Sequence, residues 1–99
     1  MPRSPIERVR EKIRLRQYDM TGHAMEEMAE DDLAITDLEH AVLSGHIARI
    51  ERHDPRGNKY VIEGVATDGL TPVGVVGRFA SGDRYLNHHW FIKLPKLEG

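Results

Sequence analysis

The apolar pattern of this chain changes period once, at Gly45. Before Gly45 the apolar residues recur at helical spacing, and from His46 onward they alternate with polar residues. The first pattern is typical of amphipathic helices and the second of strands with one solvated face. A group of helices therefore precedes a sheet along the chain. This order predicts an α+β fold in which N-terminal helices pack on an antiparallel sheet.

Three helices are predicted before Gly45, because a capping residue precedes each apolar stripe. The first is expected to run to about Arg16, and Gly45 is expected to end the third. The start signals are Ser4-Pro5, Thr21-Gly22 and Thr36-Asp37-Leu38-Glu39.

Four strands are predicted after Gly45, because turn residues at 54–58, 68–69 and 81–83 divide the alternating pattern. Turns at hairpin spacing predict a four-stranded antiparallel meander, within a single domain of residues 1–99. The expected strands are 47–52, 60–67, 72–80 and 85–94, with Ile62, Val73, Val75, Trp90 and Ile92 among the buried residues.

The 99 residues include no cysteine. Disulfides, thiolate zinc sites and a cysteine nucleophile are therefore excluded. No apolar run approaches the length of a bilayer span, and residues 1–11 lack the apolar core of a secretory signal. We therefore expect a cytoplasmic protein that does not contact a membrane.

The net charge of −2 is unevenly distributed. Residues 1–18 carry six basic and two acidic side chains, 19–40 carry eight acidic and none basic, and 41–99 carry eight basic and six acidic. The middle segment should repel a phosphate backbone, whereas the first helix and the C-terminal half could attract one. The acidic segment could equally face a basic protein partner.

His23 is the first candidate for chemistry. If Thr21 caps the second helix, His23 lies in the first turn, where backbone donors and the helix dipole act on its imidazole. In the last strand, alternation places Tyr85, His89 and Lys93 on the polar face and His88 on the core side. His88 is then expected to be a hydrogen-bonded core histidine, and His89 to have the polar setting that a site needs.

Cleavage of RNA without a metal requires an acid, a base and cations over the phosphate. Histidine serves either proton role and arginine serves the last. The predicted catalytic set is His23, Arg78 and His89, with Tyr60 and Lys93 second. No cofactor and no metal site are predicted, because no two histidines show the helical i, i+4 or strand i, i+2 spacing that aims two imidazoles at one ion.

Four motifs resemble the domain-of-unknown-function family DUF4258, and the similarity covers residues 18–92. They are T-G-H-A at 21–24, I-T-D-L-E-H-A-V-L-S-G at 35–45, D-P-R-G at 54–57 and Y-V-I-E-G-V-A-T-D-G at 60–69. The resemblance implies a helices-then-sheet fold similar to the RelE, BrnT and MqsR type toxins. Many of these toxins are metal-independent ribonucleases paired with an antitoxin, so the predicted partners are single-stranded RNA and an antitoxin protein.

The chain departs from the family pattern in two places. Members usually carry arginine in the helix after T-x-H-A, where this chain has carboxylates at 26, 27, 30, 31 and 32. They also tend to end in a strand of the type I-I-T-x-Y, where this chain has N-H-H-W-F-I-K. The alternative prediction is a non-catalytic interaction module or a degenerate toxin. In such a protein Phe91 could contact the partner, and the protein could form a homodimer.

Overall fold

The computed structural model describes residues 4–82 and 84–92, and these contain three helices and five strands. The helices precede strands β2 to β5, so the predicted α+β class is confirmed. The elements are α1 (Pro5–Arg14), β1 (Tyr18–Met20), α2 (Gly22–Glu30), α3 (Ile35–Ser44), β2 (His46–Glu51), β3 (Lys59–Val65), β4 (Pro72–Ala80) and β5 (Arg84–Ile92).

The five strands form one mixed sheet in the order β1-β5-β4-β3-β2. Strands β2 to β5 pair in the antiparallel meander that the turns predict. The sequence does not predict β1, which pairs in parallel with β5 in a register that places Tyr18 opposite Tyr85. β1 has only three residues between two helices, too few for an alternating pattern. The predicted four-stranded antiparallel sheet is therefore corrected to five strands with one parallel edge.

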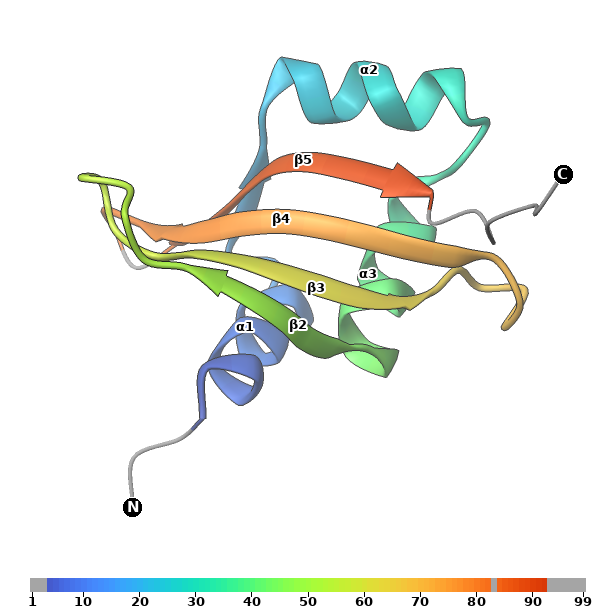
Figure 1. Ribbon diagram of the computed structural model, residues 1–99. Coiled ribbons are helices and arrows are strands. Elements are labelled where there is room, and N and C mark those ends of the chain that lie inside the picture. The colour runs from blue at the N-terminus through green and yellow to red at the C-terminus, as the bar shows by residue number, and fades with distance from the viewer. Residues whose placement is uncertain (1–3, 83, 93–99) are drawn as a thin grey trace, which may run out of the picture.

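Helices α1 and α3 lie on one side of the sheet, and α2 runs along β5 beyond the end of β1 (Figure 1). The core fills the space between α1, α3 and the sheet. The predicted burial of Ile62, Val73 and Val75 is confirmed, whereas the side chains of Trp90 and Ile92 lie outside the described residues. The largest apolar side chains that are fully buried in the core are Val9, Ile13, Leu38, Val42, Ile62, Val73, Val75 and Tyr85.

Two glycines let α3 approach the sheet closely. A methyl group at Gly64 in β3 would fall on the carbonyl oxygen of Ala41 in α3, and one at Gly45 would meet the carbonyl oxygens of Ala41 and Glu63. Both positions therefore require glycine because of backbone contact between the helix and the sheet.

Two helix starts differ in detail from the prediction. Ser4 occupies the N-cap position of α1, but its side chain makes no capping hydrogen bond. α3 begins at Ile35, so Thr36 lies inside the helix, and Asp37 Oδ2 accepts the Ala34 N–H at 3.0 Å. Among the described residues, the helices are too short and too polar to cross a membrane.

Candidate functional site

Thr21 joins the start of α2 to strand β5. Its hydroxyl accepts a hydrogen bond from the Ala24 N–H at 3.1 Å and donates one to the His88 carbonyl oxygen at 2.9 Å. The predicted cap of α2 is therefore confirmed, and His23 lies in the first helical turn. The helix start is held against the strand that carries both candidate histidines of the C-terminal half.

A β-bulge brings His88 and His89 to the same face of the sheet. Val76 pairs with His89 and Gly77 pairs with Asn87, so His88 is an extra residue in β5. An extra residue shifts the alternation of side chains by one position. Side chains before the bulge therefore point to the face opposite to the one that uninterrupted alternation predicts. Both imidazoles consequently lie on the face opposite α1 and α3.

The bulge also corrects the predicted orientation of the first half of β5. Tyr85 and Asn87 are fully buried, although alternation counted back from His89 places them on the polar face. The Tyr85 ring packs directly over Gly77, where an added methyl group would meet it. Tyr85 therefore belongs to the core and cannot assist His89, and the predicted core position of His88 is wrong for the same reason.

His23, Glu27 and His89 form a single group, which we call the His–Glu–His cluster. The Glu27 Oε1 atom lies 2.8 Å from His89 Nδ1 and 3.5 Å from His23 Nε2. The two imidazole rings are nearly parallel, with centroids 5.5 Å apart and planes inclined by 9°. Side-chain exposure is 66% for His23, 43% for His89 and 20% for Glu27, so the carboxylate lies beneath two imidazoles that solvent can reach.

Arg78 and His88 form a second polar pair on this face. Arg78 Nε donates a hydrogen bond to His88 Nε2 at 2.8 Å, so His88 accepts as a neutral imidazole with its proton on Nδ1. Burial lowers the pKa of His88 below its ordinary value, and the positive charge of Arg78 lowers it further. This bond uses one of the five N–H donors of the guanidinium, whose planar end suits a phosphate.

The cluster and the Arg78–His88 pair are neighbours on the sheet. Arg78 lies two residues from Val76, the cross-strand partner of His89, and two residues of a strand span about 7 Å. Helix α2 supplies His23 and Glu27 from the other side of β5 (Figure 1). At this spacing, two imidazoles and a guanidinium can contact one segment of a nucleic-acid chain.

Comparison with family models gives one match within this region. The family described as a domain of unknown function (DUF4258) matches residues 20–83. The chain belongs to the DUF4258 family. The match includes His23, Glu27 and Arg78 but ends before His88 and His89. Neither the comparison with curated proteins nor the comparison with solved structures gives a match.

Three of the five predicted site residues lie on one face of this DUF4258 domain, where His23 stacks on His89 and Arg78 contacts the neighbouring His88. Tyr60 does not join them, because it is 7% exposed and its ring packs edge-to-face against Phe79 in the core, with centroids 5.7 Å apart. Lys93 lies outside the described residues.

The sequence alone does not predict the place of two residues in the DUF4258 site. In the sequence Glu27 is one of several carboxylates that follow T-x-H-A, yet in the structure it contacts both imidazoles. The available signal is its i, i+4 spacing from His23, which places both side chains on one helix face. The place of His88 is not predicted because a bulge depends on strand pairing rather than on local sequence.

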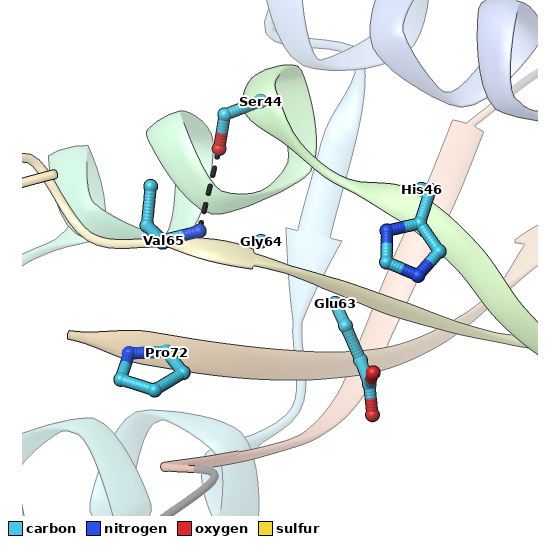
Figure 2. A pocket seen from close by; sticks show the side chains of 6 residues that line it. All are labelled: Ser44, His46, Glu63, Gly64, Val65 and Pro72. Atoms are coloured by element: carbon cyan, nitrogen blue, oxygen red, sulfur yellow. Dashed lines mark hydrogen bonds between the residues drawn. The ribbon is translucent and has the colours of Figure 1, made fainter. Parts of the chain in front are cut away.

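The same domain has a separate hollow of about 330 Å³ at the junction of α3, β2, β3 and β4, shown in Figure 2. It is lined by Ser44, His46, Glu63, Gly64, Val65 and Pro72. In Figure 2 the Ser44 hydroxyl accepts the Val65 N–H at 3.3 Å, which completes the end of β3. The hollow contains none of the predicted site residues.

Proposed function

We propose that this DUF4258 domain is a toxin-like endoribonuclease that cleaves single-stranded RNA without a metal ion. The observation that carries the proposal is the His–Glu–His cluster, in which two imidazoles from different elements share one carboxylate. Paired imidazoles can act as the base and the acid of a proton-transfer reaction near neutral pH. The α+β arrangement of helices followed by a sheet is also what resemblance to the RelE, BrnT and MqsR type toxins implies.

His89 is suited to act as the base. When its Nδ1–H donates to Glu27, Nε2 is the unprotonated ring nitrogen and therefore the one that can take a proton from the substrate. The negative charge of Glu27 also stabilises the imidazolium that forms. His23, the more exposed imidazole, is then the acid that protonates the leaving oxygen.

The reaction that follows uses the RNA as its own nucleophile. His89 takes the proton of a 2′-hydroxyl, the 2′-oxygen forms a bond to the neighbouring phosphorus, and the bond from phosphorus to the 5′-oxygen breaks. His23 gives its proton to that 5′-oxygen. The products are a 2′,3′-cyclic phosphate and a 5′-hydroxyl, and no oxidant, metal or cofactor is consumed.

Arg78 supplies the positive charge that the reaction requires. Negative charge grows on the phosphate oxygens in the transition state, and a fixed guanidinium stabilises it. His88 holds Arg78 by accepting its Nε–H, a bond that does not use the terminal nitrogens of the guanidinium. Lys93 is a further candidate for phosphate binding by its place in the sequence alone.

The acidic surface of α2 suits the second predicted partner, an antitoxin protein. Glu26 and Glu30 are exposed on this helix, and so are its C-cap residue Asp31 and Met25, which is 55% exposed. Carboxylates beside an apolar side chain favour a basic, partly apolar protein segment over a phosphate backbone. An antitoxin bound there would lie beside His23 and hinder access of RNA to the cluster.

The direct test is cleavage of single-stranded RNA by purified protein in EDTA, with detection of the 2′,3′-cyclic end. His23→Ala and His89→Ala should each slow cleavage by roughly a hundredfold or more, the range expected for loss of an acid or base, and Arg78→Ala should do likewise. His53→Ala is the matched control, because His53 is exposed between β2 and β3.

Toxicity after induced expression gives an independent measurement. Wild-type protein should arrest growth, and the His23→Ala/His89→Ala double variant should not. Full cleavage by the double variant would exclude this catalytic set. Absence of both RNA cleavage and RNA binding at low salt would favour the alternative, a non-catalytic interaction module.

A further inference from the structure

We propose that His23, Glu27 and His89 also bind one zinc-class transition-metal ion, and that this ion inhibits the nuclease. The metal site stands on the geometry of the three side chains, whereas its inhibitory effect rests on the proposed function. The cluster thus has two states, one in which its imidazoles exchange protons and one in which they coordinate a metal.

The donor atoms are already close to the spacing of a zinc site. One ligand atom from each of the three residues lies within 4.8 Å of the other two. Zinc binds imidazole nitrogen and carboxylate oxygen at about 2.0–2.2 Å, so two ligands of a tetrahedral ion lie about 3.4 Å apart. His23 Nε2 and Glu27 Oε1 are 3.5 Å apart, and His89 Nδ1 is 2.8 Å from the same oxygen, so both distances are close to this spacing. The two imidazole planes are inclined by only 9°, so one ring must turn before both nitrogen lone pairs point at one ion.

The backbone holds the three ligands in place before an ion arrives. His23 and Glu27 are one helical turn apart on α2, and His89 belongs to the paired part of β5. Thr21 connects these elements through its hydrogen bonds to Ala24 and the His88 carbonyl oxygen. Because both elements are fixed, metal binding requires only rotation of side chains, chiefly of the His23 ring, which is 66% exposed.

The ligand types select the class of ion. Two imidazoles and one carboxylate suit zinc and other late transition metals, whereas magnesium and calcium prefer sites made of oxygen ligands. Three protein ligands leave a fourth position for water on the exposed side of the cluster. We therefore expect Zn²⁺, Co²⁺ and Ni²⁺ to bind and Mg²⁺ not to bind.

Coordination would remove the groups that cleavage needs. With a metal on His89 Nδ1, the proton of that neutral imidazole lies on Nε2, so Nε2 has no lone pair for the 2′-hydroxyl proton. His23, bound through Nε2, cannot become the imidazolium that protonates the leaving oxygen, so the cluster would lose its acid and its base together. Zinc should therefore stop cleavage, and a chelator should restore it. This response is the opposite of that of a metal-dependent nuclease.

Binding is tested on the protein alone, without RNA. Protein freed of metal with EDTA and then dialysed is titrated with ZnCl₂ in a calorimeter, and Co²⁺ binding is followed by its visible absorption, which reports four-coordinate geometry. One site per chain is expected. His23→Ala, Glu27→Gln and His89→Ala should each weaken binding at least about tenfold, because loss of even an outer-sphere partner has that effect. Circular dichroism confirms that each variant is folded.

Matched variants separate this site from other surface histidines and carboxylates. His53→Ala and Glu26→Gln should bind Zn²⁺ as the wild type does, because neither residue belongs to the cluster. Unchanged affinity in all three cluster variants, or no saturable Zn²⁺ binding by the wild type, would overturn the metal site.

The experiments can overturn the proposed nuclease activity and the proposed metal site independently of each other. Zinc binding at the cluster with no RNA cleavage in EDTA would support the site and overturn both the nuclease and its inhibition. Cleavage in EDTA that continues unchanged at saturating zinc would overturn the inhibition and leave the nuclease standing. Cleavage in EDTA, its loss with ZnCl₂ and its return with a chelator are the results expected here.

Discussion

The Glu27 carboxylate lies 2.8 Å from Nδ1 of His89, a contact between helix α2 and strand β5. A carboxylate in this position fixes which ring nitrogen of a neutral histidine carries the proton and stabilises the charged form during proton transfer. In the nuclease that we propose, Glu27 would act on the reaction through His89, as a positioning residue.

Replacement of this carboxylate should slow the chemical step without weakening RNA binding. Glu27→Gln keeps the shape of the side chain but removes the negative charge that stabilises the His89 imidazolium. We expect kcat to fall by roughly tenfold or more with KM unchanged, because the charge acts in the transition state. Glu26→Gln makes the same change of charge at an exposed neighbour and should have no effect. Equal effects of the two variants would show that only the charge of the helix matters.

Local sequence signals were enough to place one half of the site. Thr21 and His23 follow from a capping residue and the helix that it starts, because a cap depends on residues three positions away. The period of two likewise identifies β2 to β5, since one face of each strand is buried in a common core.

The other half of the site depends on pairing between distant segments. The face of His88 follows from a bulge opposite Val76 and Gly77, and alternation within β5 cannot reveal it. β1 becomes a strand only by pairing with β5. Glu27 looks like a solvated carboxylate until the position of His89 is known. These errors share one cause, which is that local periodicity contains no information on register between strands.

Thr21→Ala should lower the free energy of unfolding by about 1 kcal/mol, because the Ala24 N–H loses its acceptor. The His88 carbonyl oxygen loses a donor in the same variant, which adds to the effect. A shift of the denaturant midpoint measures the change. Thr21→Ser keeps the hydroxyl and should remain close to the wild type, so equal loss in both variants would mean that the threonine methyl group is responsible.

The Asp68 carboxylate should make stability depend on acid pH. It accepts hydrogen bonds from the Thr71 hydroxyl and from the N–H groups of Thr71 and Leu70. These bonds, the Thr71 hydroxyl first, lower the pKa of Asp68 from 3.8 to about 2. The unfolded chain therefore binds more protons between these values, and stability that is present above pH 3.8 is lost as the pH falls toward about 2.

Comparison with Asp68→Asn isolates this contribution from other carboxylates. The difference in melting temperature between the wild type and Asp68→Asn should be constant near neutral pH and should shrink as the pH falls from 3.8 to about 2. A difference that is independent of pH over this range would mean that the hydrogen bonds of the turn do not depend on the charge of Asp68.

We expect Arg78 to make one electrostatic contact with an RNA phosphate. The salt dependence of RNA binding reports the number of such contacts. Each phosphate contact with a single strand contributes about 0.7 to the slope of log affinity against log salt concentration. Arg78→Gln should therefore lower the magnitude of this slope by about 0.7, measured with single-stranded RNA whose 2′-oxygens are methylated so that it cannot be cleaved. Arg14→Gln removes the same charge from an exposed position on α1, across the sheet from His88, and should leave the slope unchanged. Equal slopes for Arg78→Gln and the wild type would remove Arg78 from the phosphate-binding site, and the charge on the transition state would then require another cation.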